Sequence, residues 1–235
     1  MNNRKMIIAS TSTVHGSGYL EYLLDELKVF FKGTSELIFI PYARPSGITH
    51  DDYTARAASV FEKIGIAVKG LHEFDDPVDA IRKAEAVFTG GGNTFLLVSQ
   101  LYRFMVMEPL RESIFAGMKY LGSSAGSNIT GLTMQTTNDM PIIYPSSFKT
   151  IGAIPFNLNP HYLDPIEGNT HMGETRETRI NEFHTLNSQP VVGLREGSWL
   201  QVEGETITLK GDLSARIFEK GKPAYELPAG SVVIF

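Results

Sequence analysis

The first 135 residues alternate short apolar runs with stretches in which apolar residues recur every three or four positions. The short runs are typical of buried strands and cover residues 6–9, 37–40, 67–71, 86–89 and 120–121. Between them, the helical spacing predicts helices near Leu20, from a cap at Asp51, from Asp76-Pro77, near Phe95 and from Leu110. Strands that alternate with helices in this way predict an α/β fold with a doubly wound, mostly parallel sheet.

After Leu132 the pattern changes to short strands and turns rich in proline, asparagine and glycine, where loops are expected to carry function. One more helix is predicted over residues 174–186 and one more buried strand over residues 191–194. From residue 198 to the end, alternation around glycines predicts C-terminal antiparallel hairpins. The length of 235 residues and the 42% hydrophobic content favour a single domain over residues 1–235.

The charge balance and the missing cysteines narrow the list of partners. A formal net charge of -5 without any basic run argues against nucleic acid and against an anionic membrane. The absence of cysteine excludes disulfides and a thiolate nucleophile, and it is compatible with a reducing compartment. The apolar residues 6–9 are too few for a signal peptide, and no later run has membrane-spanning length. We therefore expect a cytoplasmic protein, monomeric or homodimeric.

The pentapeptide Gly122-Ser123-Ser124-Ala125-Gly126 lies between a predicted strand and a helix-compatible stretch. This setting is typical of a nucleophile elbow, in which a serine occupies a sharp turn that admits only small neighbours. Its hydroxyl then points out of the fold, and the first amides of the next helix surround it. The alternative is an ordinary turn, because glycine and serine are common in turns.

A second glycine loop, Gly90-Gly91-Gly92, follows another predicted strand. In a parallel sheet both loops lie at the carboxyl ends of strands, where such sheets bind ligands. The amides of Gly91 and Gly92 are therefore candidates to form an oxyanion hole with the amide of Ala125. A nucleotide cradle is disfavoured, because neither dinucleotide nor P-loop spacing is present. A purely structural turn remains the other alternative.

A serine nucleophile needs a base, and His161 in Asn159-Pro160-His161-Tyr162 is the best placed of six histidines. A base in turn needs a carboxylate to orient it. Glu196 follows the predicted strand 191–194, whereas Asp139 lies in a polar turn soon after the elbow. Both stay open as candidates on this reasoning. The remaining histidines, 15, 50, 72, 171 and 184, have no comparable setting. His, Asp and Glu residues at metal-ligand spacing are also missing.

Several motifs together resemble one serine-peptidase family, which contains the cytoplasmic α-aspartyl dipeptidases of the peptidase E type and the cyanophycinases. The resemblance extends over nearly the whole chain. It rests on Pro41-Tyr42-Ala43, Gly90-Gly91-Gly92-Asn93-Thr94-Phe95, Gly122-Ser123-Ser124-Ala125-Gly126-Ser127-Asn128, residues 136–141, Asn159-Pro160-His161, Gly173-Glu174-Thr175-Arg176-Glu177 and Glu196-Gly197. Ser123 stands where relatives often have tryptophan, so the wall beside the nucleophile is expected to differ.

The resemblance implies a fold of the class I glutamine amidotransferase-like type, with Ser124 as nucleophile and His161 as base. It favours Glu196 as the residue that orients His161, and Asp139 as a rival or as an anchor for the substrate's amino group. A cation must meet the β-carboxylate of an N-terminal aspartate, and the resemblance assigns this to Arg176. From the same motifs we take Asn93, Thr137 and Asn138 as further candidate substrate-binding residues.

The sequence thus predicts a serine hydrolase that removes aspartate from Asp-X dipeptides through an acyl-enzyme, with no metal and no cofactor. Within the same reaction class, the alternative is a cyanophycinase-like or isoaspartyl-peptide hydrolase. From another class, it is a catalytically silent protein that uses the glycine loops to bind an anionic metabolite.

Overall fold

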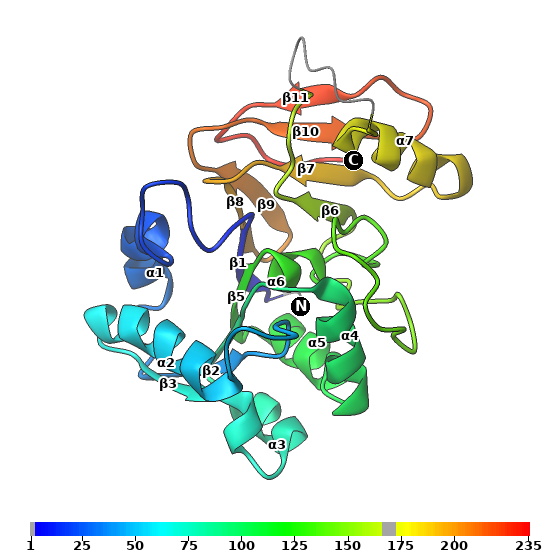
Figure 1. The fold of residues 1–235 in the computed structure, drawn as a ribbon. Helices are drawn as coiled ribbons and strands as arrows, with labels where there is room; N and C mark the ends of the chain where they lie inside the picture. The colour runs from blue at the N-terminus through cyan, green and yellow to red at the C-terminus, as the bar shows by residue number, and fades with distance from the viewer. Residues whose placement is uncertain (1–2, 166–172) are drawn as a thin grey trace.

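The computed structural model describes residues 3–165 and 173–235, and it alternates strands and helices through the first half of the chain (Figure 1). The strands there are β1 (Lys5–Ala9), β2 (Glu36–Ile40), β3 (Ala67–Gly70), β4 (Ala86–Thr89) and β5 (Lys119–Ser123). The helices are α1 (Leu24–Phe30), α2 (His50–Phe61), α3 (Pro77–Lys83), α4 (Thr94–Arg103), α5 (Met107–Ala116) and the single turn α6 (Ala125–Asn128). Short 3-10 turns lie at Glu21–Leu23, Glu62–Ile64 and Leu71–Glu73. The predicted rhythm is confirmed.

The second half contains β6 (Asn157–Pro160), α7 (Arg176–Leu186) and β7 (Val191–Leu194), followed by four further strands. These are β8 (Trp199–Glu203), β9 (Thr206–Lys210), β10 (Ala215–Phe218) and β11 (Tyr225–Leu227). The antiparallel pairs β8–β9 and β10–β11 confirm the predicted hairpins. Strand β6 was not predicted, because its sequence Asn-Leu-Asn-Pro lacks the apolar and β-branched residues that indicate a strand.

The strands form two sheets. The larger one has seven strands in the order β3-β2-β4-β5-β1-β8-β9, in which the first five run parallel and β8 is antiparallel to β1. The smaller sheet has the order β11-β10-β7-β6, with only β6 and β7 parallel. The architecture is therefore α/β, with a mostly parallel mixed sheet and a second, antiparallel-rich sheet. Strand β7, predicted over residues 191–194, therefore lies outside the sheet that contains β5, the strand before the elbow.

Helices cover both faces of the large sheet, because successive side chains of each strand point to opposite faces. On one face, Ile7 and Phe39 pack against Leu27 of α1 and Phe61 of α2. On the other face, the apolar core includes residues of α3, α4 and α5 together with residues of the smaller sheet. Figure 1 shows α7 beside β7 and β10, and Ile180 of α7 packs on Val191 and Phe218.

Polar side chains at helix starts account for several element boundaries. The side chain of Thr49 accepts the amide of Asp52 at 3.0 Å, so Thr49 caps α2 and the predicted cap at Asp51 is wrong. Thr49 lies two residues before Asp51 and serves the free amides at the start of the helix. Asp76 caps α3 as predicted, with Pro77 in the first helical position. Asn93 caps α4 by accepting the amide of Leu96.

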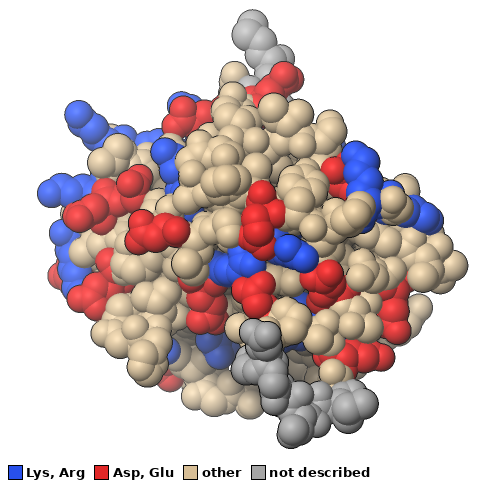
Figure 2. Space-filling view, turned by 90° about the horizontal axis from the view of Figure 1, so that it is seen from above, with Lys and Arg blue, Asp and Glu red and all other residues tan. Residues whose placement is uncertain are grey.

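Two surface properties bear on possible partners. Within the described ranges, no helix combines the length and apolar character that crossing a membrane requires. Figure 2 shows acidic and basic side chains interspersed over the face seen from above. That face therefore lacks the continuous basic patch that nucleic-acid binding typically uses.

Candidate active site

Ser124 sits on a sharp turn between β5 and α6. Its backbone has φ 54° and ψ −111°, a conformation that residues other than glycine rarely adopt. The neighbouring glycines permit this turn through close backbone approach. A Cβ on Gly122 would lie 2.5 Å from the carbonyl oxygen of Gly126, and a Cβ on Gly126 would lie 2.1 Å from that of Thr89. The predicted strand-turn-helix geometry around Ser124 is confirmed.

His161 follows β6 directly, and its ring lies against Ser124. Its Nε2 atom is 2.8 Å from the hydroxyl oxygen of Ser124. The backbone of His161 also has a positive φ of 54°. Such conformations persist only where the surrounding contacts impose them, and they are concentrated at functional sites. The loop histidine predicted as a base is thus within hydrogen-bonding distance of the predicted nucleophile.

Glu196 is the carboxylate that reaches the other side of the His161 ring. Its Oε1 atom is 2.6 Å from Nδ1 of His161, a short hydrogen bond between the ring and a carboxylate. With Nδ1–H donating to Glu196, Nε2 is left as an acceptor for the Ser124 hydroxyl. This series of hydrogen bonds is the geometry in which a serine hydroxyl can lose its proton as it attacks a carbonyl.

Asp139 occupies a different place in the same site. Its Oδ2 atom accepts the amide of Thr94 at 2.6 Å, at the start of α4, and the hydroxyl of Thr137 at 3.0 Å. It makes no hydrogen bond to His161 in the described part of the chain. Asp139 nevertheless lines a small cavity of about 20 Å³ together with Ser124 and His161. Glu196 is therefore the carboxylate bonded to His161, whereas Asp139 lines the cavity beside Ser124 and His161.

The two glycine loops meet, as the parallel sheet requires. A Cβ on Gly91 would lie 2.9 Å from Cβ and 3.4 Å from Oγ of Ser124, so the backbone of Gly91 approaches the serine closely. Gly92 packs against the carbonyl of Ala43, which would be 2.2 Å from an added Cβ. Ala125 is the first residue of α6, where helix amides have no partner within the helix. No hydrogen bond to another described residue engages the amides of Gly91, Gly92 or Ala125.

Arg176 is half-buried at the first position of α7. Burial lowers the pKa of its guanidinium and Arg179 lowers it further, whereas the charge of Asp139 acts in the opposite direction. The acidic residues that flank Arg176 have other partners, since Glu174 pairs with Arg179 at 3.5 Å and Glu177 with Arg216 at 3.3 Å. Arg176 does not line the small cavity at Ser124, so its role in substrate binding stays a prediction.

Three further candidates shape the site mainly through contacts with the protein itself. Asn93 uses its oxygen to cap α4 and its Nδ2 to bind the carbonyl of Met140 at 2.8 Å. Asn138 donates to the carbonyl of Pro160 at 2.7 Å, directly before His161. Thr137 bonds to Asp139, and both Thr137 and Asn138 line the cavity. Substrate binding by these three residues stays a prediction.

Some features of the site were not singled out in the sequence. Ser10, directly after β1, accepts the amide of His161 at 2.9 Å. Its only sequence signal is a polar residue at the carboxyl end of a buried strand. Ser123, which was expected from the sequence to alter the wall beside the nucleophile, is fully buried, and its hydroxyl makes no hydrogen bond to another described residue. Among the histidines without a predicted role, His72 pairs with Asp51, and His171 lies outside the described residues.

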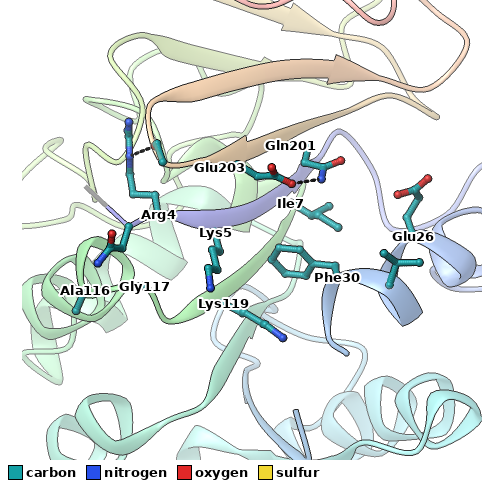
Figure 3. A pocket seen from close by; sticks show the side chains of 13 residues that line it. Arg4, Lys5, Ile7, Glu26, Phe30, Ala116, Gly117, Lys119, Gln201 and Glu203 are labelled. Carbon is teal, nitrogen blue, oxygen red and sulfur yellow. Dashed lines mark hydrogen bonds between the residues drawn. The ribbon is translucent and has the colours of Figure 1, made fainter. Parts of the chain in front are cut away.

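A larger cavity of about 600 Å³ lies at the opposite, amino ends of the parallel strands. Figure 3 shows Lys5, Lys119 and Phe30 of α1 among the side chains that line it. It shares no lining residue with the cavity at Ser124. The candidate active site is therefore identified by the hydrogen bonds at Ser124 and not by cavity size.

Comparison with known proteins identifies the family. Residues 6–210 match the model of Peptidase family S51, and the chain therefore belongs to this family. It is 49% identical to peptidase E of Streptomyces coelicolor over 226 residues, which cover 96% of this chain and 92% of that protein. It is also 43% identical to a probable alpha-aspartyl dipeptidase of Drosophila melanogaster over 227 residues, which cover 95% of this chain and 93% of that one.

Two solved structures share the fold. The crystal structure of a peptidase from an acI-B1 Actinobacterium matches with a TM-score of 0.71 at 18% identity, covering 99% of this chain and 97% of that one. A putative peptidase E from Listeria monocytogenes matches with a TM-score of 0.63 at 21% identity, covering 89% of this chain and 98% of that one. At these identities the likeness establishes the fold and no finer property.

Proposed function

We propose that the chain is a serine-type α-aspartyl dipeptidase, which hydrolyses Asp-X dipeptides through an acyl-enzyme. The observation that carries the proposal is the hydrogen-bonded series of Ser124, His161 and Glu196, with distances of 2.8 Å and 2.6 Å, in a chain of family S51. Relatives named peptidase E and alpha-aspartyl dipeptidase, aligned over nearly the full length, supply the substrate class.

In the proposed acylation, Oγ of Ser124 attacks the carbonyl carbon of the N-terminal aspartate while Nε2 of His161 takes the serine proton. The carbonyl oxygen becomes an oxyanion, which the amides of Gly91 or Gly92 and of Ala125 receive. The tetrahedral intermediate then collapses, the C–N bond breaks, and His161 returns the proton to the leaving amine. Glu196 orients the ring and stabilises the imidazolium in both steps.

In the proposed deacylation, a water molecule attacks the aspartyl ester and gives its proton to His161. The ester bond to Ser124 breaks, His161 returns a proton to the serine oxygen, and free aspartate leaves. Each proton that His161 takes it also gives back, so the cycle consumes one water and needs neither metal nor cofactor.

Recognition of the aspartyl side chain is assigned to Arg176. A carboxylate removed from water requires a cation or several donors in place of its hydration. Arg176 suits this task because its acidic neighbours pair with other arginines, and because a planar guanidinium can bind a carboxylate with two parallel bonds. Asp139 lines the cavity with a negative charge and is proposed as the partner of the substrate's ammonium group.

Three coarser properties accompany the proposal. We propose a fold of the class I glutamine amidotransferase-like type, supported by the nucleophile turn after a central parallel strand. We also propose that residues 1–235 act as one domain, supported by one apolar core that joins the two sheets. A cytoplasmic location is supported by a sequence without cysteine.

The test compares Asp-Leu, Ala-Leu and β-aspartyl-leucine as substrates, each with and without a chelator. We expect cleavage of Asp-Leu alone, unchanged by the chelator. The variant Ser124→Ala should lose roughly four orders of magnitude in turnover, while Ser59→Ala, an exposed serine on α2, should keep full activity. Preference for the β-aspartyl peptide would favour an isoaspartyl hydrolase instead. A tenth of the wild-type activity in Ser124→Ala would exclude Ser124 as nucleophile.

A further inference from the structure

The carboxyl end of β1 carries a buried hydroxyl that touches the turn of His161. Ser10 has no exposed surface, and its Oγ donates to the carbonyl of Leu194 at 2.7 Å. The same Oγ accepts the amide of His161 at 2.9 Å. Leu194 ends β7, two residues before Glu196, so one hydroxyl joins the turns that carry the base and its carboxylate.

The residue before it connects the same strand end to the nucleophile. The carbonyl of Ala9 accepts the amide of Ser124 at 3.2 Å and the hydroxyl of Ser127 at 2.6 Å. Two consecutive residues, Ala9 and Ser10, therefore contact all three turns from which Ser124, His161 and Glu196 project. The turn of Ser124 follows β5 of the large sheet, whereas the turns of His161 and Glu196 follow β6 and β7 of the smaller one, so these contacts also connect the two sheets at the site.

A hydroxyl is suited to this place because it donates and accepts at once. The ladder between β6 and β7 ends at Pro160 and Leu194, and the amide of Tyr162 already donates to the carbonyl of Leu194 at 3.1 Å. The amide of His161 turns away from this ladder, with φ at 54°. Without Ser10 it would lose its only acceptor among the described residues, at a backbone conformation that needs outside support.

We propose that Ser10 is a positioning residue that holds His161 in register with Ser124 and Glu196. The proposal rests on the proposed function, because it assumes that the Ser124–His161 pair is the reacting pair. Ser10 touches neither ring nitrogen, and it acts through the backbone of His161. Loss of its hydroxyl should displace the imidazole by up to about 1 Å, while the other residues that line the cavity stay in place.

The first measurement is the steady-state kinetics of Ser10→Ala with Asp-Leu. We expect kcat to fall roughly 10- to 100-fold, because displacement of a catalytic group by up to 1 Å costs about that much. KM should stay within about twofold. The matched control is Thr54→Val on α2, which removes a buried hydroxyl bonded to a backbone carbonyl at 2.8 Å and far along the sheet from the relay. It should keep the wild-type kcat.

A second measurement does not depend on the peptide. A fluorophosphonate reagent forms a bond between its phosphorus and Oγ of Ser124 and releases fluoride, so its rate reports the reactivity of Ser124 with its base in the absence of a peptide substrate. Ser10→Ala should react roughly 10- to 100-fold more slowly than wild type, and Thr54→Val at the wild-type rate. The downfield proton resonance of the bond between His161 and Glu196 should shift or broaden only in Ser10→Ala.

The outcomes separate the two proposals. If wild type is labelled but does not cleave Asp-Leu, the proposed substrate is wrong, and slower labelling of Ser10→Ala still supports the positioning role. Labelling and turnover of Ser10→Ala at wild-type rates would overturn that role, as would equal losses in Thr54→Val. If Ser10→Ala does not fold, Ser10→Cys replaces it, because the larger sulfur fills the site while forming weaker hydrogen bonds than the hydroxyl. Wild-type labelling of that variant would overturn the proposal.

Discussion

Replacing each of the two carboxylates by its amide distinguishes their roles. Glu196→Gln removes the negative charge that faces Nδ1 of His161 at 2.6 Å. The glutamine amide also presents an N–H to this nitrogen, which favours the tautomer with the proton on Nε2, where it cannot accept from Ser124. Asp139→Asn keeps an oxygen that can accept the amide of Thr94. Only the first change should therefore impair proton transfer.

The expected loss of kcat in Glu196→Gln depends on how far the side chains of His161 and Glu196 are exposed to water. In a fully buried serine relay, loss of the carboxylate costs about 10⁴ in kcat. Here the side chains of His161 and Glu196 are 35% and 47% exposed, so water replaces part of the lost interaction. We therefore expect kcat of Glu196→Gln to fall about 10²- to 10³-fold, which corresponds to about 3 to 4 kcal/mol in the barrier. KM should change little.

The assay measures kcat and KM for Asp-Leu in wild type, Glu196→Gln, Asp139→Asn and His161→Ala. Glu196→Gln should resemble His161→Ala in its loss of turnover, whereas Asp139→Asn should chiefly raise KM if Asp139 binds the ammonium group. The reasoning fails if Asp139→Asn matches His161→Ala while Glu196→Gln stays active. If both amide variants keep full activity, neither carboxylate orients His161.

Three further outcomes are expected. Arg176→Met should lower kcat/KM for Asp-Leu roughly 30-fold or more, which corresponds to about 2 kcal/mol, and should lower kcat/KM for Asn-Leu far less, with Arg179→Met as the control. Equal losses for both peptides would mean that Arg176 supports the fold and does not bind the aspartyl side chain. Gly91→Ala places a Cβ 2.9 Å from that of Ser124 and should lower kcat about tenfold without changing KM. A wild-type kcat in Gly91→Ala would contradict the close approach of the Gly91 backbone to Ser124. Hydrogen bonds from Arg195 lower the pKa of Asp164 and lower that of Glu226 to about 2. Because these pKa values are depressed in the folded state, their contribution to stability is present above about pH 4.5 and is lost as the pH falls toward 2. Thermal unfolding between pH 2 and 5 should therefore depend on pH less steeply in Arg195→Met, and identical slopes would refute this.

Local features of the chain were predictable because they depend on residues close in sequence. The spacing of apolar residues predicted β1 to β5 and the helices between them, and small residues around Ser124 predicted its sharp turn. The cap of α3 followed from Asp76-Pro77. The error at Asp51 is of the same local kind, since Thr49 and Asp51 lie within two residues and either side chain can satisfy a free amide.

The composition of the site depended on contacts between distant segments. Glu196 and Asp139 were equal candidates on residue type alone, and only the pairing of β6 with β7 brings Glu196 to His161. Strand β6 itself has little intrinsic strand propensity. Side-chain hydrogen bonds support it instead, because Asn128 and Thr136 both donate to the carbonyl of Leu158.

The sequence by itself determined the α/β rhythm, the elbow at Ser124 and the resemblance that the family match confirmed. The tertiary structure alone decided which carboxylate meets His161, which sheet contains β7, and that Ser10 lies between the two turns. The physical reason is the distance along the sequence over which each kind of interaction acts. Propensity, capping and turn chemistry act over a few residues, whereas the 2.6 Å contact of His161 with Glu196 spans 35 positions and requires the register between two strands.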